Sequence, residues 1–274
     1  MPDRKSRRPP QRDRERRPDR QSPGRGEAAR QPGDPALLFG VHAVTEAWAN
    51  PRRVCRRLWA TRAAWETLAR TPLPQGVARP DPLIGDRQAL DALVGPGVVH
   101  QGLVLDAAPL PEPGLDTLLE GLGGQAVLVV LDQVTDPHNV GAILRSMAAF
   151  GAAGLIVQDR HAPPVTGTLA KTASGAVEHV PIVRVVNIAR ALDDLSEAGF
   201  LTVGLAEEAD GVLGDAAASS RVAFVLGAEG PGLRRLVRER CDRLVALPTR
   251  PPIASLNVSN AAAIVLYAAA TARP

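Results

Sequence analysis

The sequence has few aromatic residues and no long apolar run. Phe, Trp and Tyr make up only 3% of its 274 residues, which argues against an RNA-binding surface that stacks bases on several aromatic rings. No apolar run approaches the ~20 residues that a membrane-spanning helix needs. The charged N-terminus lacks the apolar segment of a secretory signal peptide. We therefore expect a cytoplasmic protein with no membrane partner.

Cysteine is also scarce, and histidine is scattered. Cys55 and Cys241 are far apart and form no CxxC motif, so we expect reduced thiols that are buried as small apolar groups. The five histidines are His42, His100, His138, His161 and His179. Their spacing fits no metal-binding pattern such as HxxxH, and we expect no bound metal.

The formal net charge of +3 is unevenly distributed. Residues 1–35 carry 11 basic and 6 acidic side chains, whereas the rest of the chain carries 21 basic and 23 acidic ones. A segment with so few apolar residues cannot bury enough surface to fold, so we predict that 1–35 is a disordered basic tail. Such a tail either attracts nucleic acid electrostatically or only solubilises the protein, and both alternatives are open.

Residues 36–108 have the pattern of a small α/β domain. The sequence predicts helices near 41–48, 63–69 and 87–94, and strands near 54–60, 83–84 and 98–105. We expect Trp48, Trp59 and Trp65 to lie in its core, because large aromatic side chains dominate core burial. Pro109, Pro111 and Pro113 then predict a stiff linker over 109–124.

Residues 125–274 alternate regularly between apolar strands and helical segments. Strands are expected at 126–131, 154–158, 182–186, 200–205, 222–226 and 243–247, and helices near 138–150, 188–198, 232–239 and 257–270. Continuously apolar strands that alternate with helices predict a parallel sheet covered on both faces. Open parallel sheets bind ligands at the carboxyl ends of their strands, so the residues that follow each strand are the candidate site residues.

The first candidate motif follows the strand that ends at Leu131. Asp136 and Pro137 predict the start of a helix, as its N-cap and first residue. Val140, Ile143 and Leu144 begin its buried stripe, and Arg145 lies off that stripe. Gly141 costs ~1 kcal/mol relative to Ala in a helix, which indicates that another segment packs closely there.

Two further motifs follow. Lys171 and Ser174, in KTASGA, are either phosphate ligands or ordinary surface residues. The turn 227–232 is rich in glycine, but its spacing is GxxGxG rather than the GxGxxG of dinucleotide sites, and the strand after it supplies no acidic residue for a ribose. The last strand leads into Pro248-Thr249-Arg250-Pro251-Pro252 and then into SLNVSN and an alanine-rich helix.

Together and in this order, the motifs resemble those of the SpoU family of RNA ribose 2′-O-methyltransferases over residues 126–270. The matching residues are Asn139, Gly141 and Arg145 in the first motif, Gly227, Glu229 and Gly230 in the second, and Pro248, Ser255, Leu256, Asn257 and Ser259 in the third. Members often have a glycine between Pro248 and Ser255, where this chain has Arg250-Pro251-Pro252. Phe39–Val44 and His100–Gly102 look like parts of the ribosomal-protein-like RNA-binding domain that precedes the catalytic domain in many members.

The resemblance implies S-adenosylmethionine as cofactor, a homodimer and a C-terminal trefoil knot. It assigns cofactor binding to Gly227, Leu247 and Leu256, largely through their backbone. It implies that Arg145 acts on the ribose hydroxyl. It also implies that four residues hold the site in its ordered arrangement: Asn139, Glu229, Ser255 and Asn257. Arginine is always protonated, so we expect Arg145 to clamp a phosphate or stabilise the developing alkoxide rather than to act as a simple base.

The chain is most similar to the branch that methylates guanosine in 23S rRNA. Two alternatives are a tRNA ribose 2′-O-methyltransferase and a non-catalytic RNA-binding or ribosome-assembly factor on the same fold. Loss of Arg145, Glu229 or Asn257 would favour the non-catalytic alternative, and all three are present. The alanine-rich helix suits either a dimer contact or burial within one subunit, because small side chains let backbones approach closely.

Overall fold

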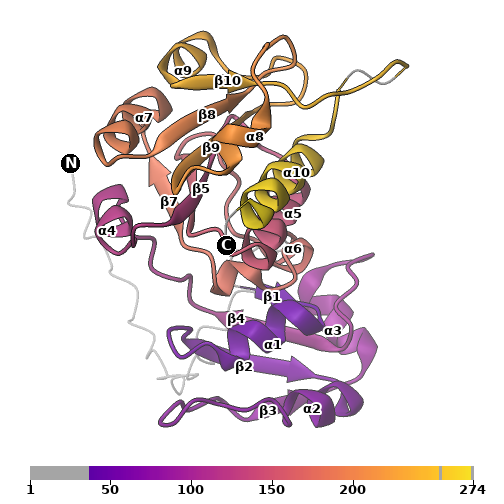
Figure 1. The fold of residues 1–274 in the computed structure, drawn as a ribbon. Coiled ribbons are helices and arrows are strands. Elements are labelled where there is room, and N and C mark those ends of the chain that lie inside the picture. Colours follow the sequence, from indigo (N-terminus) through magenta and orange to yellow (C-terminus); the bar gives the residue numbers. More distant parts are fainter. Residues whose placement is uncertain (1–36, 253–254, 273–274) are drawn as a thin grey trace, which may run out of the picture.

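The structure, a computed structural model, describes residues 37–252 and 255–272 (Figure 1). The predicted tail of residues 1–35 lies outside the described residues. Two sheets organise the chain: a four-stranded sheet formed within residues 37–107 and a six-stranded sheet formed within residues 126–245. The six-stranded parallel sheet preceded by a small α/β domain confirms the predicted fold class. The boundaries placed at residues 36, 109 and 125 remain predictions.

The first sheet is mixed and has the order β1-β4-β2-β3. Its strands are β1 (Leu37–Phe39), β2 (Cys55–Ala60), β3 (Pro82–Ile84) and β4 (Leu103–Ala107), and its helices are α1 (Val41–Ala49), α2 (Arg62–Leu68) and α3 (Arg87–Val94). β4 pairs antiparallel with both β1 and β2, and β3 is parallel to β2. Trp48 is buried and meets the edge of the Trp65 ring at 6.1 Å between centroids, whereas Trp59 and Trp65 are only partly buried.

One predicted strand of this region begins later than expected, and one strand was not predicted. The strand expected from residue 98 begins only at Leu103, because Gln101 and Gly102 adopt left-handed φ angles of 55° and 82°. The Gly102 amide donates to Nδ1 of His100 at 3.1 Å, which holds the chain in a turn. The short strand β1 was not expected, since three residues are too few to show a period in the sequence.

The second sheet is entirely parallel, in the order β10-β8-β9-β5-β6-β7. Its strands are β5 (Ala126–Asp132), β6 (Gly154–Gln158), β7 (Ile182–Val185), β8 (Leu201–Leu205), β9 (Arg221–Gly227) and β10 (Arg243–Val245). Alternate residues of β5 face opposite cores: Val127, Val129 and Leu131 belong to one apolar cluster, and Leu128 and Val130 to another. The predicted parallel sheet with two covered faces is therefore confirmed.

Helices cover both faces of this sheet (Figure 1). One face carries α5 (Pro137–Ala149), α6 (Gly167–Thr172), α8 (Leu213–Ala217) and α10 (Val258–Thr271), and the other carries α4 (Leu115–Glu120), α7 (Ile188–Glu197) and α9 (Arg235–Arg240). A 3-10 turn, η1 (Ala176–Glu178), follows α6. The helix expected from residue 232 begins only at Arg235, because the glycine-rich turn extends to that point.

Helix α5 forms as its sequence predicts. The Asp136 side chain accepts a hydrogen bond from the His138 amide at 2.9 Å, and Pro137 occupies the first turn. Val140, Ile143 and Leu144 are buried, while Arg145 is exposed. A β-carbon at Gly141 would stand 2.8 Å from the Leu169 carbonyl oxygen and from Cβ of Thr172. This glycine therefore allows α6 to pack directly against α5.

Candidate active site

The candidate site lies where the strand order reverses. β5 and β9 are neighbours with Asp132 opposite Gly227 at their carboxyl ends. From β5 the chain continues outward to β6 and β7, and then crosses to β8 on the far side of β9. Crevices at such reversal points are where open parallel sheets bind ligands. The motifs predicted from the sequence follow these strands.

Three polar side chains from distant segments meet at this edge. Nδ2 of Asn139, on α5, donates to Oε1 of Glu229 at 3.0 Å. Nδ2 of Asn257 donates to the same Glu229 oxygen at 2.5 Å and to Oδ1 of Asn139 at 3.0 Å. Asn257 is also the N-cap of α10, because its Oδ1 accepts from the Ser259 amide at 2.9 Å. The network ties α5, the glycine-rich turn and α10 together.

Beside this network is a cavity of about 550 Å³. Its lining includes Gly227, Leu247 and Leu256, which we predicted to bind the cofactor. Glu229, Ser255 and Asn257 line it as well. The ends of β8, β9 and β10 thus contribute to one concave surface. Its size falls within the ~300–1,000 Å³ typical of small-molecule sites.

Arg145 is positioned differently from the other candidates. It lies on the exposed side of α5, and within residues 37–252 and 255–272 it has no hydrogen-bond or ion-pair partner. Neither Arg145 nor Asn139 lines the cavity. The structure therefore brings Asn139, Glu229 and Asn257 into contact and leaves the Arg145 guanidinium open to a group from outside the described chain.

The glycine-rich turn is tightly folded. A side chain at Gly227 would collide with the backbone of Gly232 and Leu233. The Gly232 amide donates to the Ala228 carbonyl at 3.0 Å, and Gly230 and Gly232 have φ angles of 83° and 67° that favour glycine. These glycines give the turn the compact shape that directs Glu229 toward Asn139 and Asn257.

The end of β8 contributes residues that the sequence analysis missed. Glu207 and Glu208 follow this strand and line the cavity, as does Arg238 of α9. Arg238 pairs with Glu208, and its hydrogen bond lowers the pKa of that carboxyl below the usual value. We considered only an acid at the end of β10, whereas β8 is the strand next to β9 in the sheet. Glu207 and Glu208 could have been predicted as site residues, because they closely follow the predicted strand that became β8.

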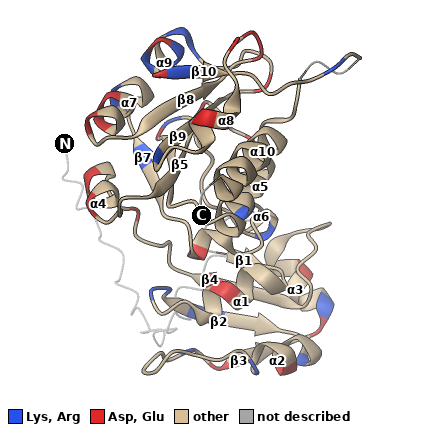
Figure 2. Cartoon of the chain, in the orientation of Figure 1, with Lys and Arg blue, Asp and Glu red and all other residues tan. Residues whose placement is uncertain are grey.

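Figure 2 shows basic residues along α9, and within the described residues the side chains of these arginines are paired rather than free. Arg235 contacts Glu239 at 2.7 Å and Arg240 contacts Asp193 at 2.7 Å, in addition to the Arg238–Glu208 pair. Exposed pairs of this kind contribute little to the stability of the fold, because solvent screens their attraction. Their acidic partners offset the positive charge of α9, so this helix presents no uncompensated basic face.

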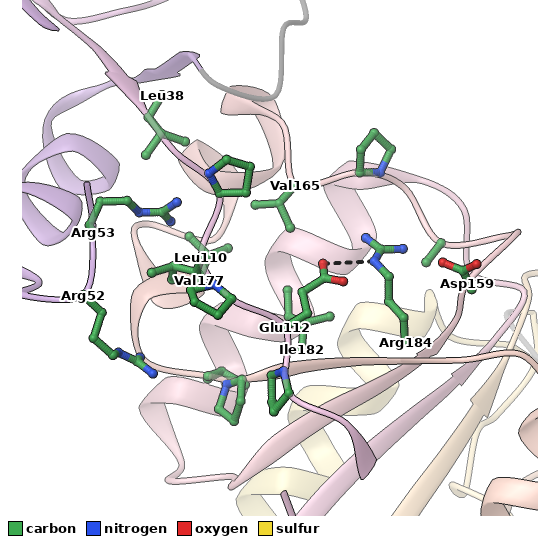
Figure 3. Close-up of a pocket in the computed structure, with 17 residues that line it drawn as sticks. Leu38, Arg52, Arg53, Leu110, Glu112, Asp159, Val165, Val177, Ile182 and Arg184 are labelled. Carbon is green, nitrogen blue, oxygen red and sulfur yellow. Dashed lines mark hydrogen bonds and ion pairs between the residues drawn. The ribbon is translucent and has the colours of Figure 1, made fainter. Parts of the chain in front are cut away.

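A larger cavity, of about 720 Å³, lies where the linker meets both sheets (Figure 3). It contains none of the predicted site residues, and many of its lining residues are apolar or proline. Its arginines are already engaged: Nε of Arg184 donates to Glu112 at 3.0 Å, and Arg53 pairs with Glu178. Gly227, Glu229, Ser255, Leu256 and Asn257 of the sequence motifs line the smaller cavity instead.

The geometry agrees with the sequence comparisons. Residues 126–267 match the SpoU rRNA Methylase family, and residues 37–113 match the module described as RNA 2'-O ribose methyltransferase substrate binding. The protein belongs to the SpoU family. Among curated relatives, the 23S rRNA (guanosine-2'-O-)-methyltransferase RlmB of a Burkholderia species is 39% identical over 239 residues, which cover 86% of this chain and 96% of the relative. RlmB of Pseudomonas syringae pv. tomato is 40% identical over 238 residues, covering 85% and 94%.

Solved SpoU structures share the fold. The SpoU methyltransferase AviRb from Streptomyces viridochromogenes, solved in complex with AdoMet, superposes with a TM-score of 0.71 at 26% identity. The superposition covers 86% of this chain and 89% of AviRb. No helix in the part of the chain that the structure describes is long and apolar enough to cross a membrane. Within the same residues, no group of three or more His, Cys, Asp or Glu side chains is placed to hold a metal ion.

Proposed function

We propose that this protein methylates the ribose 2′-hydroxyl of a guanosine in 23S rRNA, with S-adenosylmethionine as the methyl donor. Membership of the SpoU family, with RlmB enzymes as relatives over most of the chain, carries this proposal. The contact between Asn139, Glu229 and Asn257 beside the strand-end cavity supports it. Action on rRNA would place the protein in the cytoplasm.

The residues of the smaller cavity fit the cofactor. The cavity is lined by the glycine-rich turn 227–233 and by the apolar side chains of Leu247 and Leu256. The backbone amides and carbonyls of the turn can bind polar groups of the cofactor, and the two leucines can contact its adenine ring. When bound, S-adenosylmethionine supplies an electrophilic methyl group on a sulfonium. We propose that Gly227, Leu247 and Leu256 hold it, and that Ser255, which also lines the cavity, helps to order the site.

The chain's own contribution is to align the reactants and to stabilise charge. In favourable cases, alignment of the reactants alone lowers the activation free energy by about 7–11 kcal/mol. We propose that Asn139, Glu229 and Asn257 fix the shape of the ribose site through their mutual hydrogen bonds. Arg145, charged and without an internal partner, would contact the reacting nucleotide and stabilise negative charge at the 2′-oxygen or its neighbouring phosphate.

We further propose that the protein is a homodimer that contacts its partner through α10 and α5. Ile264 and Tyr267 on α10 are 42% and 58% exposed, although α10 packs against α5 within the subunit. The edge of the Tyr267 ring meets the Phe150 ring at 5.9 Å between centroids. An exposed apolar surface of this kind favours association. The trefoil knot implied by the family remains a prediction.

The experiment that tests the function compares RNA from cells with and without the protein. Mapping of 2′-O-methyl groups should show one guanosine of 23S rRNA that loses its methyl group when the protein is absent. The purified protein with S-adenosylmethionine should restore that methyl group on unmodified rRNA. Loss of a tRNA methyl group instead would assign the activity to tRNA. Unchanged methylation of both RNAs, with no transfer by the purified protein, would overturn the enzymatic proposal.

A further inference from the structure

The KTASGA motif, which includes Lys171 and Ser174 and runs from α6 into η1, faces the N-terminal sheet rather than the open cavity. Nζ of Lys171 donates to the Val99 carbonyl at 2.7 Å, across the boundary between the two sheets. A side chain at Gly167 would collide with the Leu37 carbonyl and the Phe39 ring. Residues 167–179, which we term the docking segment, therefore approach the N-terminal domain closely.

Glu178 is the centre of this contact. Its side chain has 0% exposure, and Arg53 donates to both of its oxygens, through Nε at 3.1 Å and through Nη2 at 2.5 Å. Nδ2 of Asn50 donates to the same carboxylate at 2.8 Å. The Arg52 guanidinium donates to the Glu178 carbonyl at 3.2 Å. Three residues within positions 50–53 of the N-terminal domain thus bind one residue of the methyltransferase domain.

The contact has a defined geometry that restricts how the two domains can be oriented. A carboxylate and a guanidinium removed from water are tolerated only when each is paired and hydrogen-bonded, and a two-point Arg–carboxylate contact has a fixed geometry. Arg53 also donates to the Ala108 carbonyl at 2.7 Å, at the start of the linker. In Figure 3, Arg53 lies at one end of the junction cavity and the Glu112–Arg184 pair joins the linker to β7 at the other.

The docking segment also contacts the helix that carries the candidate catalytic residues. Gly141 of α5 packs against Leu169 and Thr172 of α6, and Oγ1 of Thr172 lies 3.4 Å from Nδ1 of His138. One short segment therefore links the N-terminal domain to α5, on which Asn139 and Arg145 lie. A change in how the domains dock would move RNA held by the first domain relative to these two residues.

We infer that Glu178 is a positioning residue for methyl transfer: by holding Arg53 and Asn50, it fixes the N-terminal domain so that RNA bound there meets Arg145 and Asn139. This inference rests on the proposed function. Glu178 touches neither the cavity nor the network of Asn139, Glu229 and Asn257, so it acts through the position of the domain.

The test compares Glu178→Gln with the parent and with Glu239→Gln, which makes the same change in the exposed Arg235–Glu239 pair of α9. A displacement of about 1 Å far from the chemistry can cost on the order of 100-fold in rate, so we expect Glu178→Gln to lower kcat/KM for 23S rRNA by about 10- to 100-fold. Its affinity for S-adenosylmethionine, measured by calorimetry, should match that of the parent. X-ray scattering should show a larger radius of gyration, and Glu239→Gln should match the parent in every measurement.

Lys171→Met provides a second variant if Glu178→Gln does not fold, because it removes only the half-exposed contact with Val99. Lys171→Met should also lower kcat/KM for rRNA, by a smaller factor than Glu178→Gln, and should leave the affinity for S-adenosylmethionine unchanged. An unaltered kcat/KM and radius of gyration in the folded variant would overturn the inference. Loss of cofactor binding in parallel with loss of methylation would also overturn it, because Glu178 would then support the whole fold. A parent protein that methylates no RNA would refute the proposed function, and scattering would still decide whether Glu178 fixes the domains.

Discussion

Arg234 binds Asp132 through both its backbone and its side chain. The Arg234 amide donates to one carboxylate oxygen at 2.9 Å, and its Nε donates to the other at 2.7 Å. Asp132 is fully buried at the end of β5, and Arg234 closes the glycine-rich turn that begins at Gly227. The pair therefore anchors the far end of the turn that carries Glu229, while the close approach of Gly227 to Gly232 holds the near end.

We predict that Asp132→Asn loosens this turn. Removing one partner of a buried ion pair costs about 3–5 kcal/mol, and partial exposure of Arg234 reduces this, so we expect a loss of about 1–3 kcal/mol in the free energy of unfolding. Affinity for S-adenosylmethionine should fall as well, because the turn lines the cavity. Denaturant unfolding and calorimetry measure the two effects. Asp193→Asn, in the exposed Arg240–Asp193 pair, should change neither by more than about 1 kcal/mol. Equal behaviour of the two variants would contradict the anchoring role.

Local features of the structure were predictable from sequence, whereas the contacts between distant segments were not. The start of α5 was predictable from Asp136 and Pro137, and its close packing from Gly141. The effects of a cap, a proline and a glycine are confined to about one helical turn, so they can be read from neighbouring residues. Nothing local pairs Arg53 with Glu178, which lies 125 residues away. A sequence therefore does not reveal that a charged residue is buried unless its partner is already known.

The same distinction applies to the candidate site: its local features were predictable from the sequence, and its contacts between distant residues were not. The strand ends that carry the motifs followed from apolar periodicity, and the family resemblance named their residues. Asn139 and Glu229 are 90 residues apart, and they meet because β5 and β9 are neighbours, an order that no single segment encodes. The turn at 98–102 was mistaken for a strand because Val98, Val99 and Leu103 are apolar, while Gln101 in a left-handed conformation gives no signal in the sequence.

We predict that Tyr267→Glu weakens the dimer. The side chain is 58% exposed on the surface that we assign to the contact with a second subunit, and a carboxylate buried there would have no partner. Light scattering across micromolar concentrations should return a dimer for the parent and a larger monomer fraction for the variant. Leu236→Glu places the same charge at a similarly exposed apolar position on α9 and should remain dimeric. A monomeric parent would rule out the dimer itself.

The Cys241 thiol should resist alkylation in the folded protein. Burial, and then the nearby carboxylates of Asp242 and Asp132, raise its pKa to about 12, and the thiol donates to the Val237 carbonyl at 3.3 Å. Because the thiolate is the reactive form, only about one molecule in ten thousand is reactive at pH 8. The rate of modification by iodoacetamide should rise about tenfold per pH unit from pH 8 to 10. Denatured protein, with an ordinary thiol, should react quickly at pH 8, and equally quick reaction of Cys241 in the folded state would contradict the raised pKa.

We predict that residues 1–35 contribute to RNA binding through charge. Each phosphate contact that a basic side chain makes steepens the dependence of log K on log salt by about 0.7–0.9, so deletion of the tail should weaken binding and flatten that slope. A tail of the same length with its 11 basic residues changed to glutamine should behave like the deletion. Titrations of rRNA at several salt concentrations measure the slope. An identical slope for the truncated and parent proteins would leave the tail as a solubilising extension.

Arg145 distinguishes an enzyme from a protein that only binds RNA. It is exposed and, within the described residues, makes no hydrogen bond or ion pair, so Arg145→Ala should change stability by no more than about 0.5 kcal/mol. Loss of a preorganised charge at the transition state should nevertheless lower the single-turnover rate by about 10²–10³ at saturating RNA and cofactor. Arg145→Lys should recover little of that rate, because an ammonium cannot reproduce the planar guanidinium fork. Cofactor affinity should be unchanged, since Arg145 does not line the cavity. Full activity of a folded Arg145→Ala protein would remove this residue from the chemistry.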